Sequence, residues 1–180
     1  KEHGDSSLFD GIILNSPFFD FNKSWFVKKC IPFASFVGGF LPGIKIAGGF
    51  TEQYGKFLHR ESRGEWEYNL AWKPHVAPRI NLGWVRAIHR AQRELRQPFE
   101  VRKPVLVLHS ERSVSSFSDE EQVQSRDAIL NIRGQVEIVS VLGGLHDLVL
   151  SCKEVRGKVY QIMFDWLVRQ NGTNDRNCPG

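Results

Sequence analysis

The stretch Val136-Glu-Ile-Val-Ser-Val-Leu-Gly-Gly-Leu-His-Asp-Leu-Val-Leu-Ser151 is the most informative part of the sequence. It begins as an apolar run rich in β-branched residues and continues into a Gly-Gly pair, the pattern of a strand followed by a turn. His146 comes just after this turn, at the place where a catalytic residue is exposed on a rigid scaffold. Because imidazole titrates near neutral pH and passes protons both ways, His146 is suited to act as a catalytic base. The competing interpretation is a histidine that only caps or packs the loop.

Two further apolar runs, Asp10–Pro17 and Lys103–His109, have the length and composition of buried parallel strands. A capping-box pattern opens the segment Ser118–Leu130, which we expect to be a helix. A third strand is expected over Gln135–Leu142, and the apolar spacing within Glu154–Arg169 predicts an amphipathic closing helix. Strands that alternate with helices in this order indicate an α/β fold whose crossover connections build a parallel sheet.

The residues from about 20 to 97 have a different character, with many aromatics, glycine pairs and prolines, and only Leu82–Leu95 has a convincing helical pattern. We expect this segment to be an inserted lid or cap, and the polar residues 171–180 to be a disordered tail. The aromatic residues of the lid either pack it onto the body or line an apolar acyl pocket, and both interpretations stay open. These residues are Trp25, Phe26, Phe33, Phe36, Phe40, Phe50, Trp66, Trp72 and Trp84.

The composition is that of an ordinary globular domain, with 180 residues, 41% hydrophobic and 24% charged. The net charge of +4 is mild, and the basic residues are scattered. Arg86, Arg90 and Arg93 recur at helical spacing, which favours a solvated helix face over a phosphate-binding stripe, so no nucleic-acid partner is expected. No apolar run reaches the roughly 18 residues of a membrane-spanning helix, and we expect no transmembrane segment.

The three cysteines, Cys30, Cys152 and Cys178, are odd in number and lack Cys-x-x-Cys spacing. This pattern argues against a disulfide framework or a zinc knuckle and fits a reducing compartment, so we expect a cytoplasmic location. Cys152, at the start of the closing helix, is expected to be a small buried residue.

A metal site is also not expected, and neither is any other cofactor. Four residues with suitable side chains could converge in the fold, but no two of them have the spacing of metal ligands along a helix or turn. They are His109, Glu111, Asp119 and His146.

Three segments together resemble the second half of an α/β-hydrolase: Phe9–Pro17, Pro104–Ser110 and Gly143–Asp147. The sequence is most similar to the branch of serine aminopeptidase S33, monoacylglycerol lipase and lysophospholipase-like enzymes, and the resemblance covers roughly residues 9 to 167. It implies that the strand after the nucleophile helix ends in Ser16-Pro17, that a cap insertion follows, and that the last two strands carry the acid and the histidine of a catalytic triad.

By this resemblance His146 is the triad base, and His109 occupies the place of a structural, buried and hydrogen-bonded histidine. The acid departs from the family pattern, because the position of the usual Asp falls on Ser113. Glu111 is the best substitute, and Asp127 is the alternative acid, since a carboxylate on a neighbouring element can still reach the histidine.

No serine of the chain has the setting of an activated nucleophile. There is no Gly-x-Ser-x-Gly turn, and neither Ser16 nor Ser151 is expected in the strained strand-turn-helix setting that exposes the attacking oxygen. The resemblance implies that the nucleophile and the oxyanion hole lie upstream of Lys1, so we expect the chain to be part of a longer protein. Asp147 is expected to anchor the loop or the following helix and not to transfer protons.

The sequence therefore predicts a serine hydrolase acting on carboxylic esters, of lipid or acylglycerol type, that is inactive as this chain alone. Its partner is then a small-molecule ester or lipid substrate. The alternative is a non-catalytic α/β-hydrolase-like binding or interaction protein that uses the capped apolar pocket without turnover. Acyl length and oligomeric state stay open.

Overall fold

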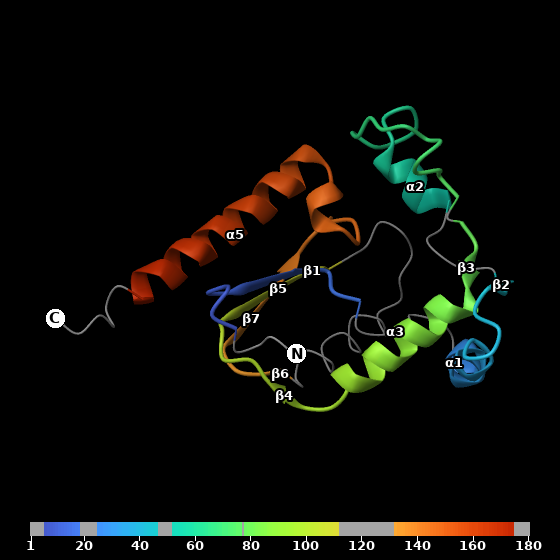
Figure 1. The fold of residues 1–180 in the computed structure, drawn as a ribbon. Coiled ribbons are helices and arrows are strands. Elements are labelled where there is room, and N and C mark those ends of the chain that lie inside the picture. Colours follow the sequence, from blue (N-terminus) through green and yellow to red (C-terminus); the bar gives the residue numbers. More distant parts are fainter. Residues whose placement is uncertain (1–5, 19–24, 47–51, 77, 112–131, 175–180) are drawn as a thin grey trace. The chain divides into compact units, whose positions relative to one another are not determined.

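The computed structural model of the chain describes residues 6–18, 25–46, 52–76, 78–111 and 132–174. The chain divides into two compact units (Figure 1). Unit 1 comprises Lys1–Pro17, Pro98–Gln122 and Ile132–Gly180, and unit 2 comprises Phe18–Gln97 and Val123–Asn131. The helix expected over Ser118–Leu130 lies outside the described residues.

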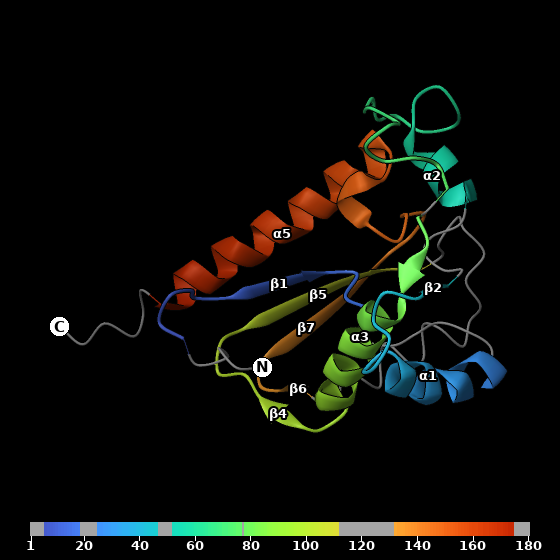
Figure 2. The ribbon, with the colours of Figure 1, turned by 45° about the vertical axis from the view of Figure 1, so that its right-hand side comes forward.

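Unit 1 contains a parallel sheet of β1 (Ile12–Asn15), β5 (Val105–Ser110) and β7 (Val136–Val141), in the order β1-β5-β7 (Figure 2). Asn15 is level with Leu108, so β5 extends two residues beyond the end of β1. A short parallel pair, β4 (Phe99–Glu100) with β6 (Ile132–Arg133), precedes β5 and β7. The structure thus has the α/β class and the parallel sheet that the alternation of apolar strands and helices predicts.

The central strand β5 is the most deeply buried part of this sheet. Val105 to Leu108 are at most 2% exposed, which explains why the strand has an unbroken apolar sequence and no alternation. The expectation of a fully buried first strand was wrong, because the residues of β1 are only half-buried. Within the described residues β1 has one neighbouring strand, β5, and therefore lies at an edge.

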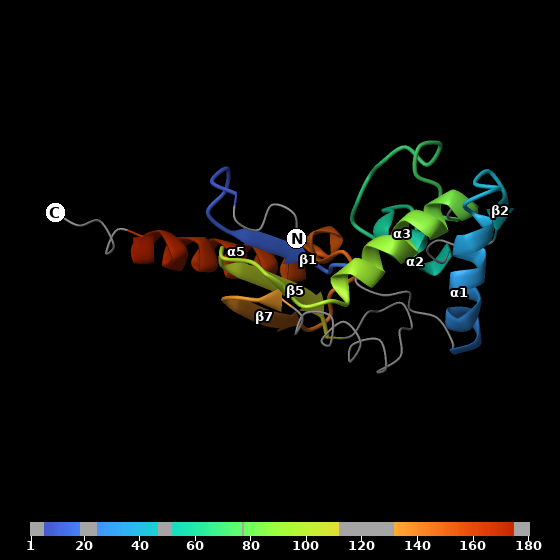
Figure 3. The same ribbon diagram turned by 60° about the horizontal axis from the view of Figure 1, so that its bottom comes forward.

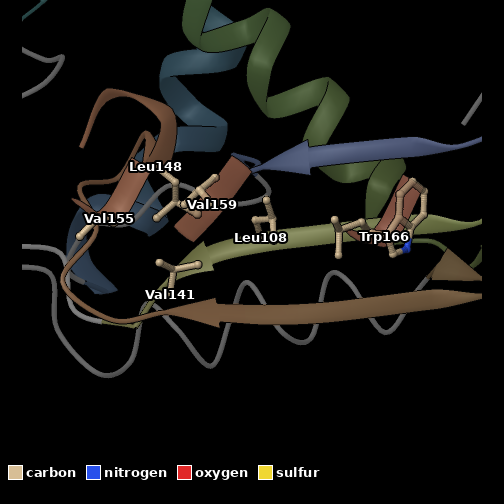
Figure 4. Packing of buried hydrophobic residues seen from close by; sticks show 7 residues of the cluster. Leu108, Val141, Leu148, Val155, Val159 and Trp166 are labelled. Carbon is tan, nitrogen blue, oxygen red and sulfur yellow. The ribbon is translucent and has the colours of Figure 1, made fainter. Parts of the chain in front are cut away.

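The helix α5 (Lys153–Asn174) runs along one face of the sheet of unit 1 (Figures 1 and 3). Its buried side chains join those of β5, β7 and the single turn η1 (Leu148–Leu150) in one hydrophobic cluster (Figure 4). The cluster consists of Leu106, Leu108, Val141, Leu148, Val155, Val159 and Trp166. Burying a large apolar side chain contributes about 1.5–3 kcal/mol, so this cluster is the main source of stability in unit 1.

Two details of α5 differ from the prediction. The helix continues past Arg169 to Asn174, into the segment expected to be a disordered tail; residues 175–180 lie outside the described residues. Its apolar residues are also not confined to one face, because Phe164 is 62% and Val168 71% exposed. The prediction of a helix was therefore correct, but the prediction that its apolar residues lie on one buried face was wrong.

The described residues of unit 2 form three helices, α1 (Trp25–Val37), α2 (Glu52–Leu58) and α3 (Leu82–Leu95). Strand β2 (Lys45–Ile46) pairs antiparallel with β3 (Ile80–Asn81). The bounds of α3 are those that the sequence predicts. At its start, the side chain of Asn81 accepts a hydrogen bond of 2.7 Å from the N–H of Trp84, the capping contact that ends the preceding strand and begins a helix.

The expectation of a single convincing helix in this segment was wrong, because α1 and α2 are also present. Pro32 lies inside α1, where it removes one backbone hydrogen bond and masks the helical pattern in the sequence. Packing against α3 within unit 2 stabilises α1 nevertheless. Several aromatic residues of this segment are exposed, among them Phe33, Phe36 and Trp72. The side chains of Trp25 and Phe26, and Phe50, lie outside the described residues.

Candidate active site

The C-terminal edge of the sheet in unit 1 brings together three of the predicted positions. Ser16 follows β1 directly, Glu111 follows β5 directly, and His146 lies in the turn after β7. Because the three strands are parallel and adjacent, these segments emerge at one edge, where reactive groups gather in open parallel sheets (Figure 2). The candidate active site is built from this edge.

The two glycines before His146 have different reasons to be glycine. Gly143 has a φ of 76°, in the left-handed region that glycine adopts without the steric cost of a side chain. At Gly144 a Cβ atom would lie 2.3 Å from Cδ2 of Leu148, a side chain that is fully buried in the core and has no room to withdraw. The first glycine allows the turn, and the second allows the turn to lie against the core.

His146 is exposed, whereas the two residues after it are anchored. The side-chain amide of Asn15, the last residue of β1, donates a hydrogen bond of 2.6 Å to Oδ1 of Asp147. Oδ1 of Asn15 accepts a hydrogen bond of 3.2 Å from the N–H of Leu148. The anchoring role expected for Asp147 is thus confirmed, and Leu148 also fixes the loop through its buried side chain.

The residues before His146 are held from two further sides. The hydroxyl of Ser110, at the end of β5, donates to the carbonyl of Gly144 at 2.7 Å. The N–H of Leu145 donates to Oγ of Ser151, whose side chain is buried, at 2.8 Å. Ser151 therefore acts as an acceptor that closes the loop upon itself. The turn presents an exposed imidazole on a backbone that hydrogen bonds fix on both sides.

Sequence analysis missed Asn15 and Ser110 as parts of the site. Each is a polar residue at the end of an apolar strand, and that position at the C-terminal edge of a parallel sheet is the signal that could have identified them. Their partners, Asp147 and Gly144, are far away in the sequence, so the contacts themselves could not be inferred from spacing.

Glu111, the preferred acid, lies exposed at the end of β5. Its N–H donates to the carbonyl of Val141 at 3.0 Å, which continues the pairing of β5 and β7 by one more hydrogen bond. The residue is thereby held beside the start of the turn that carries His146. The alternative acid, Asp127, and Ser113, at the family's usual Asp position, lie outside the described residues. The identity of the acid stays a prediction.

His109 has the hydrogen-bonded role expected of it, although it is half-buried and not fully buried. It is level with Ser140 of the neighbouring strand β7, and its Nε2 lies 2.9 Å from the hydroxyl oxygen of Ser140. This contact links two adjacent strands one residue before β5 ends. His109 therefore contributes to the sheet beneath the candidate site.

The backbone at Ser16 is strained, but its hydroxyl is not placed as that of a nucleophile. Its φ of 46° lies in the left-handed region, which residues with a side chain seldom adopt. Its hydroxyl oxygen is nevertheless buried and has no hydrogen-bond partner among the described residues. A nucleophile needs an exposed and activated oxygen, so the geometry of Ser16 gives it no such role.

The expectation of a buried Cys152 was wrong. Its carbonyl accepts a hydrogen bond of 2.9 Å from the N–H of Arg156, so the residue stands immediately before the first turn of α5, and its thiol is exposed. Cys30 is exposed as well, and Cys178 lies outside the described residues.

Two further properties concern the described residues alone. Among them no group of three or more His, Cys, Asp or Glu side chains is arranged to hold a metal ion. None of the helices within the described ranges combines the length and apolar character needed to cross a membrane.

The fold is similar to that of two monoglyceride lipases of known structure. One is a soluble variant of monoglyceride lipase from Saccharomyces cerevisiae in complex with a substrate analogue, with a TM-score of 0.62 and 18% identity over 89% of this chain and 56% of that one. The other is monoacylglycerol lipase from Paleococcus ferrophilus, with a TM-score of 0.62 and 18% identity over 90% of this chain and 60% of that one. The chain therefore spans less than two thirds of the length of either lipase.

No protein-family model matches the sequence, and no curated protein matches it at the sequence level. At 18% identity, the two lipase structures establish the fold alone, an α/β fold with a parallel sheet.

Proposed function

We propose that the protein to which this chain belongs is a serine hydrolase of carboxylic esters, of lipid or acylglycerol type, and that His146 is its general base. The observation that carries this proposal is the turn after β7: an exposed imidazole on a loop that Asn15, Ser110 and Ser151 hold at the C-terminal edge of the sheet. The similarity of the fold to two monoglyceride lipases supports the reaction class.

The attacking serine is proposed to come from residues outside these 180. The absence of a Gly-x-Ser-x-Gly turn from the sequence supports this, as does the coverage of only 56% and 60% of the two lipases. We further propose that residues 20–97 are an inserted lid or cap, which is supported by the assignment of residues 18–97 to the second compact unit.

His146 would act twice in each half of the reaction. It takes the proton of the serine hydroxyl as the oxygen attacks the ester carbonyl, and then gives that proton to the departing alcohol. Water next attacks the acyl-enzyme, again losing a proton to His146, which returns it to the serine as the carboxylic acid leaves. These proton transfers need an exposed base on a backbone that keeps its place, and the anchored turn supplies such a base.

The experiment is a comparison of ester turnover in the full-length protein and its His146→Ala variant. We expect kcat to fall at least about 1,000-fold, because the proton transfer in both halves of the reaction is lost. His109→Gln is the matched control: it alters a histidine of the same sheet that contacts Ser140, and kcat should stay within about threefold. Unchanged turnover in His146→Ala would refute the role of the histidine.

The acid is tested by replacing Glu111 with Gln and Asp127 with Asn, separately. The true acid holds the imidazole in the correct tautomer and stabilises its charged form, so its loss should lower kcat about 1,000-fold or more while the other variant stays near wild type. We propose Glu111, because its N–H is bonded to Val141 beside the turn. If neither variant loses activity, neither residue is the acid.

A second candidate function is a non-catalytic binding protein with the same fold. The observation that favours it is Ser113 at the position where the family resemblance implies an Asp. A fluorophosphonate probe, which reacts only with activated serines, distinguishes the two functions in the full-length protein. Covalent labelling supports the hydrolase, and the absence of labelling with retained binding of a fluorescent fatty-acid ester supports the binder.

A further inference from the structure

One side chain on β1 contacts both residues that follow His146. Asn15 donates through Nδ2 to Oδ1 of Asp147 at 2.6 Å and accepts through Oδ1 from the N–H of Leu148 at 3.2 Å. These partners lie 132 and 133 residues away in the sequence. The donor and the acceptor of one side-chain amide therefore both bond to the two residues directly after the candidate base.

The support beneath Asn15 is rigid. Asn15 is level with Leu108 of β5, which is fully buried in the center of the sheet. Leu148 is itself fully buried, so the segment that Asn15 contacts cannot move away without opening the core. Two strands thus hold the backbone around His146 in place. Asn15 links it to β1, and the hydrogen bond from Ser110 to Gly144 links it to β5.

The contact requires an amide at position 15 and an acceptor oxygen at position 147. The ionised carboxylate of Asp147 only accepts hydrogen bonds, and the N–H of Leu148 only donates one. Asparagine offers a donor and an acceptor at its two ends and satisfies both. An aspartate at position 15 would still accept from Leu148 but would place two carboxylates against each other, at a separation where like charges repel strongly.

We propose that Asn15 is a positioning residue for His146, which it orients through Asp147 and Leu148 without touching the substrate; the inference rests on the proposed function of His146. We call this arrangement the Asn15–Asp147 clamp. It fixes the direction from which the imidazole meets the serine hydroxyl. An error of about 1 Å in such a direction lowers catalysis about 100-fold.

The clamp is tested in the full-length protein with Asn15→Asp, Asp147→Asn and the double variant that exchanges the two residues. Asn15→Asp should lower kcat about 100-fold with little change in KM, because the base is displaced while the residues that bind the substrate are unchanged. Asp147→Asn should stay within about threefold, since its Oδ1 still accepts from Asn15. The exchange restores a donor opposite an acceptor, so its kcat should return to within about tenfold of wild type.

The matched control is Asn81→Asp, which makes the same change of charge at the N-cap of α3. Aspartate and asparagine are equally good N-cap residues. Its kcat should be that of wild type. A simple loss of folding would lower the active fraction of Asn15→Asp and be visible as a lower midpoint of thermal unfolding, whereas rescue by the exchange at equal stability requires the paired contact. Wild-type kcat in Asn15→Asp, or no recovery in the exchanged variant, would overturn the clamp.

A readout that does not depend on turnover separates this inference from the proposed function. The Cε1–H resonance of the His146 ring, assigned by its loss in His146→Ala, should shift in Asn15→Asp and return in the exchanged variant. If the wild-type protein hydrolyses no ester, the proposed function fails. This resonance still decides whether the clamp determines the position of the His146 ring. A resonance that stays unmoved in Asn15→Asp contradicts the clamp in either case.

Discussion

An aromatic side chain of the helix α5 in unit 1 and one of the helix α1 in unit 2 differ sharply in burial. Trp166 of α5 is 1% exposed and packs in the cluster with β5 and η1, whereas Phe33 of α1 is 71% exposed. Among the described residues, α5 packs with strands of a sheet, whereas α1 packs on the helix α3. The difference teaches that a flat, continuous apolar surface, and not aromatic content, determines which aromatic side chains form a core.

The largest expected effect comes from removing the aromatic centre of the α5 cluster. Trp166→Ala should lower the free energy of unfolding by about 3–5 kcal/mol, because the loss of buried area leaves a cavity that the strands cannot close. Urea unfolding measures this change. Phe164→Ala, on the exposed side of the same helix, is the control and should cost less than about 1 kcal/mol. Equal losses in the two variants would mean that burial does not distinguish the faces of α5.

The packing around Trp166 can also be tested by adding an atom next to its ring. A Cβ atom at Gly11 would lie 2.8 Å from Cη2 and 3.2 Å from Cζ3 of Trp166, a ring that is held on all sides. Gly11→Ala should therefore destabilise the protein by about 1–3 kcal/mol through overpacking. Gly157→Ala, an exposed position of α5 with no heavy atom within 4 Å of the new Cβ, should instead stabilise it by about 0.5–1 kcal/mol. A stabilising Gly11→Ala would show that the tryptophan is loosely packed.

A substitution in the core of unit 2 is expected to stabilise the protein, in contrast to the substitutions in the core of unit 1. Gln92 of α3 is 2% exposed, and neither polar atom of its side-chain amide has a hydrogen-bond partner among the described residues. Gln92→Leu removes a buried amide that has no partner among those residues and should raise the free energy of unfolding by about 1 kcal/mol. Thermal unfolding followed by circular dichroism is sufficient for the measurement. A loss of stability would indicate that the amide has a partner in the folded protein.

The smallest effect is expected at the exposed face of α1. Phe33→Ser should change the free energy of unfolding by no more than about 0.5 kcal/mol, since the ring is exposed in the structure. The same unfolding experiment as for Trp166→Ala gives a direct comparison. A loss as large as that of Trp166→Ala would show that a surface covers Phe33 in the folded protein and would remove the contrast between the two helices.

The sequence predicts those elements whose pattern is local. The unbroken apolar run of β5, the helical pattern of α3 and the Gly-Gly turn before His146 each carry their own signal. The helix α1 could not be predicted because Pro32 interrupts its pattern and packing on α3 compensates. Burial was misjudged wherever it depends on neighbours, as for the half-buried β1 and the exposed Cys152.

In the candidate site, too, local features were predicted and long-range contacts were not. His146 and its anchor Asp147 were predicted from adjacent residues, whereas Asn15 was not, because its hydrogen bond to Asp147 spans 132 residues. The two glycines before His146 were recognised as a turn, but only the structure explains why Gly144 lies against Leu148. Contacts between distant strand ends need the sheet order, which the apolar runs do not specify.

The insertion of residues 18–97 between β1 and β5 has a consequence for the order of folding. Asn15 is level with Leu108 across this whole segment, whereas β5 and β7 are joined by a shorter connection. The entropy lost on closing a loop grows with its length, by about 0.6 kcal/mol per doubling, and pairings between distant residues form late. We therefore expect β5, β7 and α5 to assemble first and β1 to join last, so that the turn bearing His146 forms before Asn15 arrives to secure it.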